Sequence, residues 1–125
     1  MEININIFVL EDEIERIKWF ESTFNDCSMF ITCDVDDACL KLKENKYDLI
    51  FLDRDLADST KSGEDVARIM EKDKLNTDAC IVVHTVNPVG RINIKKCLDS
   101  YHNNVNFIDF TQLKKLKRKD FKLRI

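Results

Sequence analysis

Short runs of β-branched and aromatic residues alternate with segments of helical periodicity along the whole chain. Such runs are typical of buried strands, whereas apolar residues three or four positions apart are typical of helices. The sequence predicts strands over residues 3–10, 29–33, 47–52, 79–83 and 105–110. It predicts helices over residues 14–24 and 34–45, a third from Ser62, a fourth ending near Ser100 and a weaker last one from Gln112. Strands that alternate with helices form a parallel sheet covered by helices on both faces.

We therefore predict a flavodoxin-like three-layer α/β/α sandwich whose five parallel strands lie in the order 2-1-3-4-5. A length of 125 residues fits one domain, which we place at residues 1–125. The apolar content of 44% is typical of a chain that buries a core. Five cysteines without a C-x-x-C pair argue against a disulfide framework and a zinc knuckle. We expect a cytoplasmic protein without a membrane span, because no apolar run reaches the ~20 residues that a span needs.

Polar residues gather where three of the predicted strands end. They are Glu11 and Asp12 after the first strand, Asp53 and Asp55 after the third, and His84, Thr85 and Asn87 after the fourth. These three strands are neighbours in the predicted order, and ligands of such sheets bind beyond the carboxyl ends of the strands. We expect the three groups to meet in one crevice.

Up to four carboxylates would then share that crevice. Two unit charges ~5 Å apart at an effective dielectric constant of ~20 repel each other by about 3 kcal/mol. Either some of the acids bind a proton at a raised pKa, or a divalent cation lies among them, and oxygen ligands favour Mg²⁺. We favour the cation. The alternative is that the acids only cap the following helices, which explains Asp12 and Asp53 least well because both follow directly on buried-type strands.

The same residues resemble the receiver domain of two-component response regulators. The resemblance covers essentially the whole chain and rests on Leu10-Glu11-Asp12-Glu13, Leu49-Ile50-Phe51-Leu52-Asp53 and Thr85. It implies that Glu11 and Asp12 are an acidic metal pair, that Asp53 is the phosphoacceptor and that Thr85 contacts a phosphoryl group. Receivers have a lysine after the fifth strand, where this chain has Ile108-Asp109-Phe110. Losing a charge-assisted contact of roughly 1.5 to 3 kcal/mol should weaken ordinary phosphorelay switching.

A closer resemblance is to the divergent cyclic-phosphate processing receiver domains. Their Asp-x-Asp-Leu and His-Ser-x-Asn-x-x-Gly motifs are similar to residues 53–56 and 84–90, with Thr85 in place of the serine. Arg16, Ser62-Gly63 and Val66-Ala67 add to the likeness. The resemblance implies an enzyme that acts on the cyclic phosphate of a nucleotide or of an RNA end.

The chemistry is also plausible from the residues alone. A metal held by Glu11, Asp12 and Asp53 could neutralise a phosphodiester and lower the pKa of a bound water molecule. His84 could transfer a proton to the leaving sugar oxygen. The alternative for His84 is a core histidine whose hydrogen bonds are satisfied within the fold.

The remaining candidate site residues would bind the substrate. Thr85 and Asn87 can donate hydrogen bonds to phosphate oxygens, and Arg91 could clamp a phosphate through two parallel hydrogen bonds. We place Asp55 in the same group, although Arg91 could equally be a solvated residue and the loop before it only a helix start. Arg16 either joins the substrate site or orients the acids through an ion pair.

The chain ends in a strongly basic tail. Seven lysines and arginines follow residue 111: Lys114, Lys115, Lys117, Arg118, Lys119, Lys122 and Arg124. They could contact nucleic acid. A terminal helix with solvated lysines explains them better, with four residues directed inward: Leu113, Leu116, Phe121 and Leu123.

Three functions remain open at this point. The first is a Mg²⁺-dependent phosphoesterase whose partner is a phosphate-containing small molecule or an RNA end. The second is a signalling receiver that is phosphorylated on Asp53 and binds a protein partner. The third is a pseudo-receiver that binds its partner without any chemistry.

Overall fold

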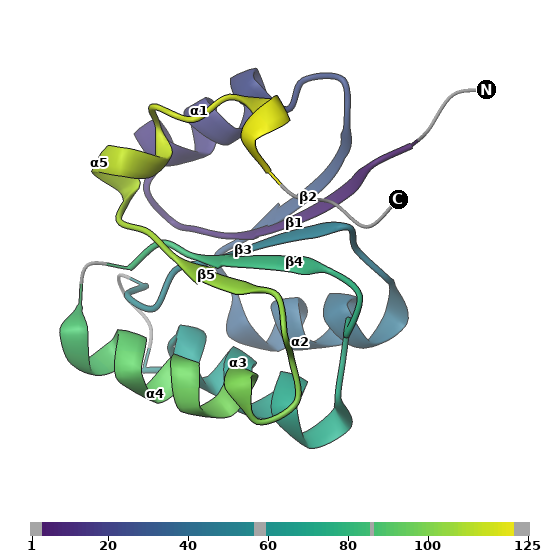
Figure 1. Cartoon of the computed structure of the whole chain (residues 1–125), viewed down its shortest axis with the longest axis vertical. Coiled ribbons are helices and arrows are strands. Elements are labelled where there is room, and N and C mark those ends of the chain that lie inside the picture. The colour runs from purple at the N-terminus through teal and green to yellow at the C-terminus, as the bar shows by residue number, and fades with distance from the viewer. Residues whose placement is uncertain (1–3, 57–59, 86, 122–125) are drawn as a thin grey trace.

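The structure is a computed structural model, and it describes residues 4–56, 60–85 and 87–121. It contains one sheet of five parallel strands in the order β2-β1-β3-β4-β5, as predicted (Figure 1). The strands are β1 Asn6–Leu10, β2 Ser28–Thr32, β3 Leu49–Leu52, β4 Cys80–Val83 and β5 Val105–Phe107. The helices are α1 Ile14–Thr23, α2 Val35–Glu44, α3 Gly63–Asp73, α4 Pro88–Asp99 and α5 Phe110–Leu113, followed by a 3₁₀ turn, η1 Arg118–Asp120.

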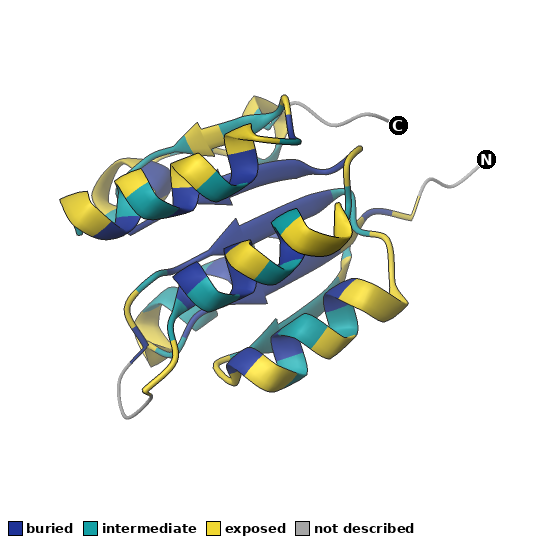
Figure 2. Ribbon diagram, turned by 90° about the horizontal axis from the view of Figure 1, so that it is seen from below, coloured by how far each residue is buried: buried dark blue, intermediate teal, exposed yellow. Residues whose placement is uncertain are grey.

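The helices form two layers, which confirms the three-layer architecture. In Figure 1, α1 and α5 lie above the sheet and α2, α3 and α4 lie below it. Successive residues of a strand point to opposite faces, so Ile7 and Val9 pack toward α1, while Phe8 and Leu10 pack toward α2 and α3. The central strands β3 and β4 are buried along their whole length (Figure 2). This double burial explains why these two strands are continuous apolar runs.

Polar caps fix where the helices begin. Asp34 accepts a hydrogen bond from the backbone N–H of Asp37 at the start of α2. Ser62 and Asp65 form a reciprocal capping box at the start of α3. Asn87 caps α4, whose first residue is Pro88.

The C-terminal part differs from the prediction. The fifth strand ends at Phe107 rather than at residue 110, because the Asp109 carboxylate accepts a hydrogen bond from the backbone N–H of Gln112 at 3.0 Å and starts a helix there. That helix, α5, begins before Gln112 and ends at Leu113. Leu113 is fully buried, whereas Leu116 and Phe121 are half-buried. Leu123, Lys122 and Arg124 lie outside the described residues.

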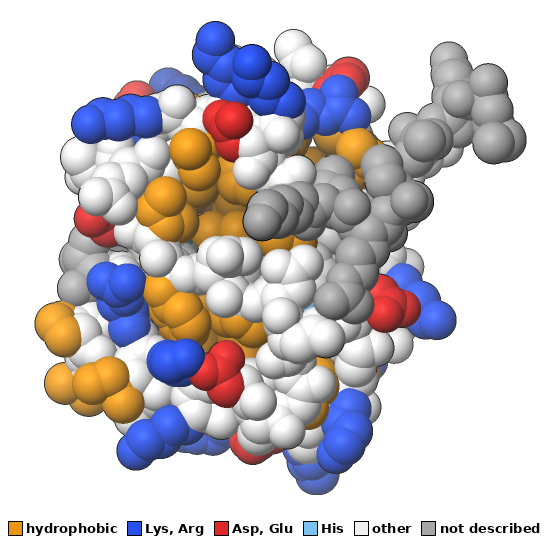
Figure 3. Space-filling model, viewed as in Figure 1, with side chains coloured by type: hydrophobic (Ala, Val, Ile, Leu, Met, Phe, Trp, Pro, Cys, Tyr) orange, Lys and Arg blue, Asp and Glu red, His pale blue; other side chains and the backbone are white. Residues whose placement is uncertain are grey.

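The basic tail is exposed to solvent. Lys114, Lys115, Lys117 and Lys119 are all exposed, and basic side chains gather along the upper margin of Figure 3, over α1 and the C-terminal segment. This agrees with a solvated face. In the described part of the chain, no helix is both long enough and apolar enough to cross a bilayer.

Candidate functional site

The register of the sheet places the residues that follow three neighbouring strands side by side. Leu10 of β1 pairs with Leu52 of β3, and Leu52 pairs with Val83 of β4. The next residues along the chain are Glu11, Asp53 and His84, which we call the acid–histidine cluster. One potential ligand atom of each lies within 4.8 Å of the other two, and all three residues are buried. Three strand ends thus meet at one point.

Glu11 is held by hydrogen bonds on both of its carboxylate oxygens. Its Oε1 lies 2.9 Å from Nε2 of His84, and its Oε2 accepts from the backbone N–H groups of Asp12 at 3.0 Å and Glu13 at 3.1 Å. Burial alone would raise the pKa of Glu11, but the hydrogen bond of His84, the backbone N–H of Glu13 and the charge of Arg16 outweigh it and lower that pKa. Glu11 is therefore the ionised member of the cluster.

His84 lies beneath this carboxylate and has no exposed surface. Its ring packs against Phe20, Phe51 and Phe110, at centroid distances of 5.5, 6.5 and 6.4 Å. The Nδ1 atom is buried without a hydrogen-bond partner, and burial lowers the pKa of the ring. We assign the neutral tautomer with its proton on Nε2, because a charged ring would bury an unpaired N–H group. His84 has no surface of its own through which to contact a substrate.

Asp53 is the acid of the pair whose ionised form is less well stabilised. Its Oδ1 accepts a hydrogen bond from the backbone N–H of Asp55 at 3.3 Å. Burial, followed by the charge of Glu11, raises the pKa of Asp53 to about 8. Arg16 is the nearby cation: its Nη1 lies 3.8 Å from Asp53 Oδ2 and 3.7 Å from Glu11 Oε1. These distances give ion pairs without hydrogen bonds, so the positive charge compensates the two acids only in part.

A hollow of about 500 Å³ opens beside the cluster. We call it the strand-end hollow, and it is lined by Asp12, Arg54, Asp55, Leu56, Thr60, Lys61 and Ser62. Asp12 is half-buried in its wall and lies outside the acid–histidine cluster. The three predicted metal ligands are therefore divided: Glu11 and Asp53 lie in the cluster, and Asp12 lies in the hollow next to it.

Thr85 and Asn87 lie at the end of β4, close to Asp55. The Thr85 hydroxyl lies 3.4 Å from Oδ2 of Asp55, to which it can donate, and it accepts from the backbone N–H of Asn87 at 3.2 Å. The Asn87 side chain accepts from the backbone N–H of Gly90 at 2.9 Å. The side-chain oxygen of Asn87 thus serves as a helix cap, and its amide nitrogen donates to none of the residues that the structure describes.

Arg91 lies apart from the acids. Its guanidinium lies 6.0 Å from the centroid of the Phe107 ring, on the α4 side of the sheet. Within the described part of the chain, none of its polar contacts involves the acid–histidine cluster. The predicted role of Arg91 as a phosphate clamp stays a prediction.

Comparison with known proteins identifies the family. Residues 6–100 match the model of the cyclic-phosphate processing receiver domain. The chain belongs to this family. The sequence matches none of the curated proteins.

Solved structures similar to this receiver domain include response regulators and the receiver domain of a sensor histidine kinase. The phosphorylated cyanobacterial phytochrome response regulator RcpA has 18% identity and a TM-score of 0.75, with 98% of this chain and all 100% of that chain covered. TrrA of Thermotoga maritima, solved in complex with Mg²⁺ and BeF, has 22% identity and a TM-score of 0.65, with 89% and 94% covered. The receiver domain of a Pseudomonas aeruginosa sensor histidine kinase, with a magnesium ion coordinated in its active-site cleft, has 18% identity and a TM-score of 0.68, with 90% and 93% covered. At these identities the likeness shows the fold.

The position of the usual receiver lysine is occupied differently in this receiver domain. Asp109 caps α5 there, and the cation beside Asp53 is Arg16, which comes from α1. The Arg16 guanidinium lies 5.0 Å from the centroid of the Phe110 ring, which holds it over the acids. The sequence pattern singled out both the missing lysine and Arg16, but not the relation between them.

Sequence reasoning missed Arg54 and Glu64. Nε of Arg54 donates to Oε1 of Glu64 at 3.0 Å, and Nη1 donates to Asp55 at 2.8 Å. The chain's two glycines are a signal that could have revealed this pair. A Cβ on Gly63 would lie 2.2 Å from the backbone oxygen of Asp53, and one on Gly90 would lie 2.7 Å from the Arg54 side chain. Both glycines therefore leave room for the chain at Asp53 and Arg54.

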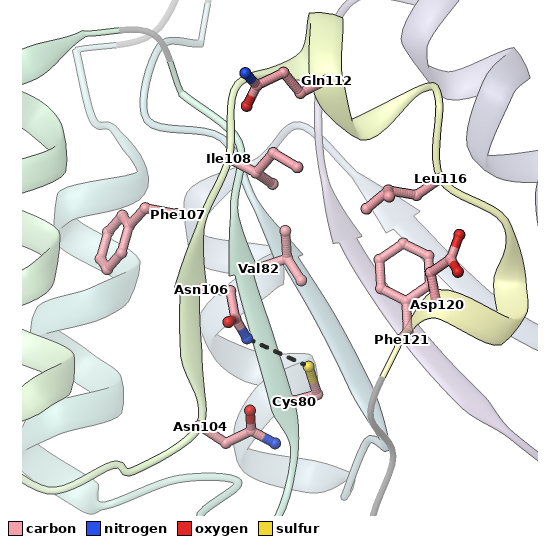
Figure 4. Close-up of a pocket in the computed structure, with 10 residues that line it drawn as sticks. All are labelled: Cys80, Val82, Asn104, Asn106, Phe107, Ile108, Gln112, Leu116, Asp120 and Phe121. Atoms are coloured by element: carbon pink, nitrogen blue, oxygen red, sulfur yellow. Dashed lines mark hydrogen bonds between the residues drawn. The ribbon is translucent and has the colours of Figure 1, made fainter.

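A second hollow lies away from this chemistry. It has a volume of about 430 Å³ and lies beside β5, where the short α5 leaves part of the sheet uncovered. Figure 4 shows its apolar floor at Val82 and Ile108 and its walls at Leu116 and Phe121. Hydrophobic side chains are visible there in Figure 3. Among the described residues that line it, the one carboxylate is Asp120, so these residues lack the converging acids that mark the strand-end site.

Proposed function

We propose that this receiver domain is a Mg²⁺-dependent phosphoesterase that opens cyclic phosphates. The observation that carries the proposal is the buried pair of Glu11 and Asp53, whose oxygens lie within 4.8 Å of each other. Two such carboxylates cannot both be charged without compensation, and Arg16 is too distant for a hydrogen bond to either. The raised pKa of Asp53 is the consequence when no cation is bound.

The residues present fit a divalent cation. Carboxylate oxygens are the ligands that Mg²⁺ prefers, and Glu11 and Asp53 would hold the ion, with Asp12 supplying a ligand from the wall of the hollow. When bound, the cation would neutralise the charge of a phosphodiester and activate water for attack. Two of the similar receivers are described with magnesium, one of them in its active-site cleft, which supports this choice of ion.

The remaining residues bind and orient. The Thr85 hydroxyl would turn its proton from Asp55 to a phosphate oxygen, and the Asn87 amide would donate a second hydrogen bond to the phosphate. His84 would hold Glu11 in place from below and so act on the substrate only through Glu11, because its ring is sealed by phenylalanines. The substrate would be the cyclic phosphate of a nucleotide or of an RNA end in the cytoplasm.

The test is turnover of a ribonucleoside 2′,3′-cyclic phosphate with Mg²⁺ and with a chelator, followed by separation of the opened monoester. We expect turnover only with Mg²⁺ and its loss in Asp53→Asn. Glu21→Gln is a matched control, because Glu21 is an exposed acid on α1 and the substitution removes the same charge. Equal turnover in chelator, or none across adenine, guanine, cytosine and uracil nucleotides, would contradict the proposal.

A second function is phosphorylation of Asp53. It is favoured by the place of Asp53 directly after β3, beside the strand end that carries Thr85. Incubation with a small phosphodonor and Mg²⁺ should then add one phosphoryl group to the intact protein and none to Asp53→Asn, and the modified protein would signal to a separate protein partner. If neither the ion nor the phosphoryl group binds, the pseudo-receiver is the function that remains.

A further inference from the structure

We propose that Arg54 binds the phosphate group of the ligand in the strand-end hollow. The proposal deepens the proposed function and rests on it only in that the ligand carries a phosphate. Arg54 follows Asp53 directly and lines the hollow together with Asp12. Its side chain is 31% exposed, so the guanidinium is open to a ligand without being a loose surface group.

The guanidinium is already fixed from behind. Its Nε donates to Glu64, a residue that is 7% exposed, and its Nη1 donates to the exposed Asp55. An arginine has five N–H donors, and among the described residues these two bonds engage two of them. An arginine held in this way loses little conformational entropy when a ligand binds, and its planar fork matches the oxygens of a phosphate.

Further contacts keep the charge of Arg54 available. Glu64 also accepts from Nη2 of Arg68 at 3.3 Å and from the amide of Asn93 at 3.3 Å. Arg68 therefore neutralises part of the charge of Glu64, so that the ion pair with Glu64 does not cancel the whole positive charge of Arg54. Glu64 is held by α3 and α4 at once, which makes it a rigid support for the guanidinium.

Gly90 gives Arg54 its path to this support. The Arg54 stem lies over Gly90 in the first turn of α4, where an added Cβ would lie 2.7 Å from Cγ and Cδ and 3.0 Å from Nε. Any other residue at this position would move the stem. Gly90, one of the chain's two glycines, thus leaves the space through which the Arg54 side chain reaches Glu64.

The other cations near the hollow are directed elsewhere. Lys61 bonds with Asp36 on α2 at 2.6 Å, and Arg91 lies against the ring of Phe107. Arg16 forms ion pairs with Glu11 and Asp53 and is not among the described residues that line the hollow. Arg54 is therefore the cation whose geometry best matches a phosphate in this hollow.

Calorimetric titration of the full chain in Mg²⁺ tests the proposal, with inorganic phosphate in one arm and adenosine 2′,3′-cyclic phosphate in the other. The arm that binds more tightly identifies the source of the phosphate. We expect Arg54→Gln to weaken that binding at least about tenfold, the effect of losing a charge-assisted hydrogen bond. Lys96→Gln is the control, because Lys96 is exposed on α4.

Gly90→Ala is the second variant, and it keeps every charge. Gly90 has a negative φ, so alanine fits the helix backbone, and the three heavy atoms nearest to the added Cβ all belong to the Arg54 side chain rather than to backbone. We expect a folded protein with weakened phosphate binding. Unchanged binding in Arg54→Gln, or absence of phosphate binding in the wild type, would overturn the proposal.

The two proposals fail separately. Phosphate binding that depends on Arg54, without turnover of any cyclic phosphate, would contradict the proposed phosphoesterase activity and support the proposed role of Arg54. Turnover that Arg54→Gln does not reduce would contradict the proposed role of Arg54 and support the proposed phosphoesterase activity.

Discussion

Nε2 of His84 lies 2.9 Å from Oε1 of Glu11, although the two residues are 73 positions apart in the chain. The contact lies beneath the sheet's carboxyl edge and is closed from solvent, since both side chains are 0% exposed. Glu11 is charged here because His84 and two backbone N–H groups satisfy it. The buried pair lies directly beside Asp53, with potential ligand atoms of the three residues within 4.8 Å of one another.

His84→Ala should destabilise the fold. The substitution leaves the Glu11 carboxylate buried without its strongest partner and opens a cavity among phenylalanines, which together cost about 2–4 kcal/mol. Urea unfolding gives the free energy, and a cycle with Glu11→Ala isolates the contact, for which we expect a coupling of about 1.5–3 kcal/mol. Additive effects of the two substitutions would show that the contact contributes nothing.

Asp53 should make the metal-free protein less stable as pH rises. Between about 3.9, the pKa of an unfolded aspartate, and about 8, its pKa in the fold, the folded protein holds a proton that the unfolded chain has released. Raising the pH through this window therefore favours unfolding, by at most about 1.4 kcal/mol per pH unit.

The measurement is denaturant unfolding in chelator at several pH values between 5 and 8. Asp53→Asn removes the titrating group, so its stability should gain on that of the wild type as pH rises. A constant difference between the two proteins over this range would show that Asp53 does not hold the proton.

Mg²⁺ should reverse this instability. A ligand that binds only the folded state at ten times its Kd adds about 1.4 kcal/mol, which is a rise in Tm of several degrees. Trp19 offers a second signal, because its ring lies 5.5 Å from Phe110, whose ring in turn supports Arg16. We expect saturable changes in Tm and fluorescence that are absent in Asp12→Ala and Asp53→Asn but retained in Glu21→Gln. Identical responses in all four proteins would argue against this site.

Gly63→Ala and Gly90→Ala should differ in their effect on stability. A Cβ at Gly63 would lie 2.2 Å from the backbone oxygen of Asp53, which cannot move without disturbing the strand end, whereas a Cβ at Gly90 meets a side chain. We expect Gly63→Ala to cost more than about 2 kcal/mol and Gly90→Ala to lower the free energy of unfolding by much less. Thermal unfolding of the two variants side by side decides this, and equal losses would be the contrary result.

The fold could be predicted because burial on both faces makes the central strands β3 and β4 continuous apolar runs that stand out from their surroundings. The meeting of Glu11, Asp53 and His84 could be expected for the same reason, since each residue directly follows a strand of the predicted sheet. The depth of His84 could not be predicted, because Phe20 and Phe110 seal it from elements that are distant in the sequence. The Arg54–Glu64 pair depends on the directions of two side chains, and the short α5 depends on a single cap at Asp109. The periodicity of apolar residues contains neither kind of information.

Backbone hydrogen bonds that continue the sheet ladder hold the acid–histidine cluster. The N–H of Asp53 donates to the carbonyl of Leu10, and the N–H of His84 donates to the carbonyl of Leu52. Opening of such ladder bonds requires the central strands to separate, which is among the rarest fluctuations of a folded domain. Rearrangement of the surrounding connections leaves these atoms in position. The three side chains of the cluster therefore keep their relative positions for as long as the central strands stay paired.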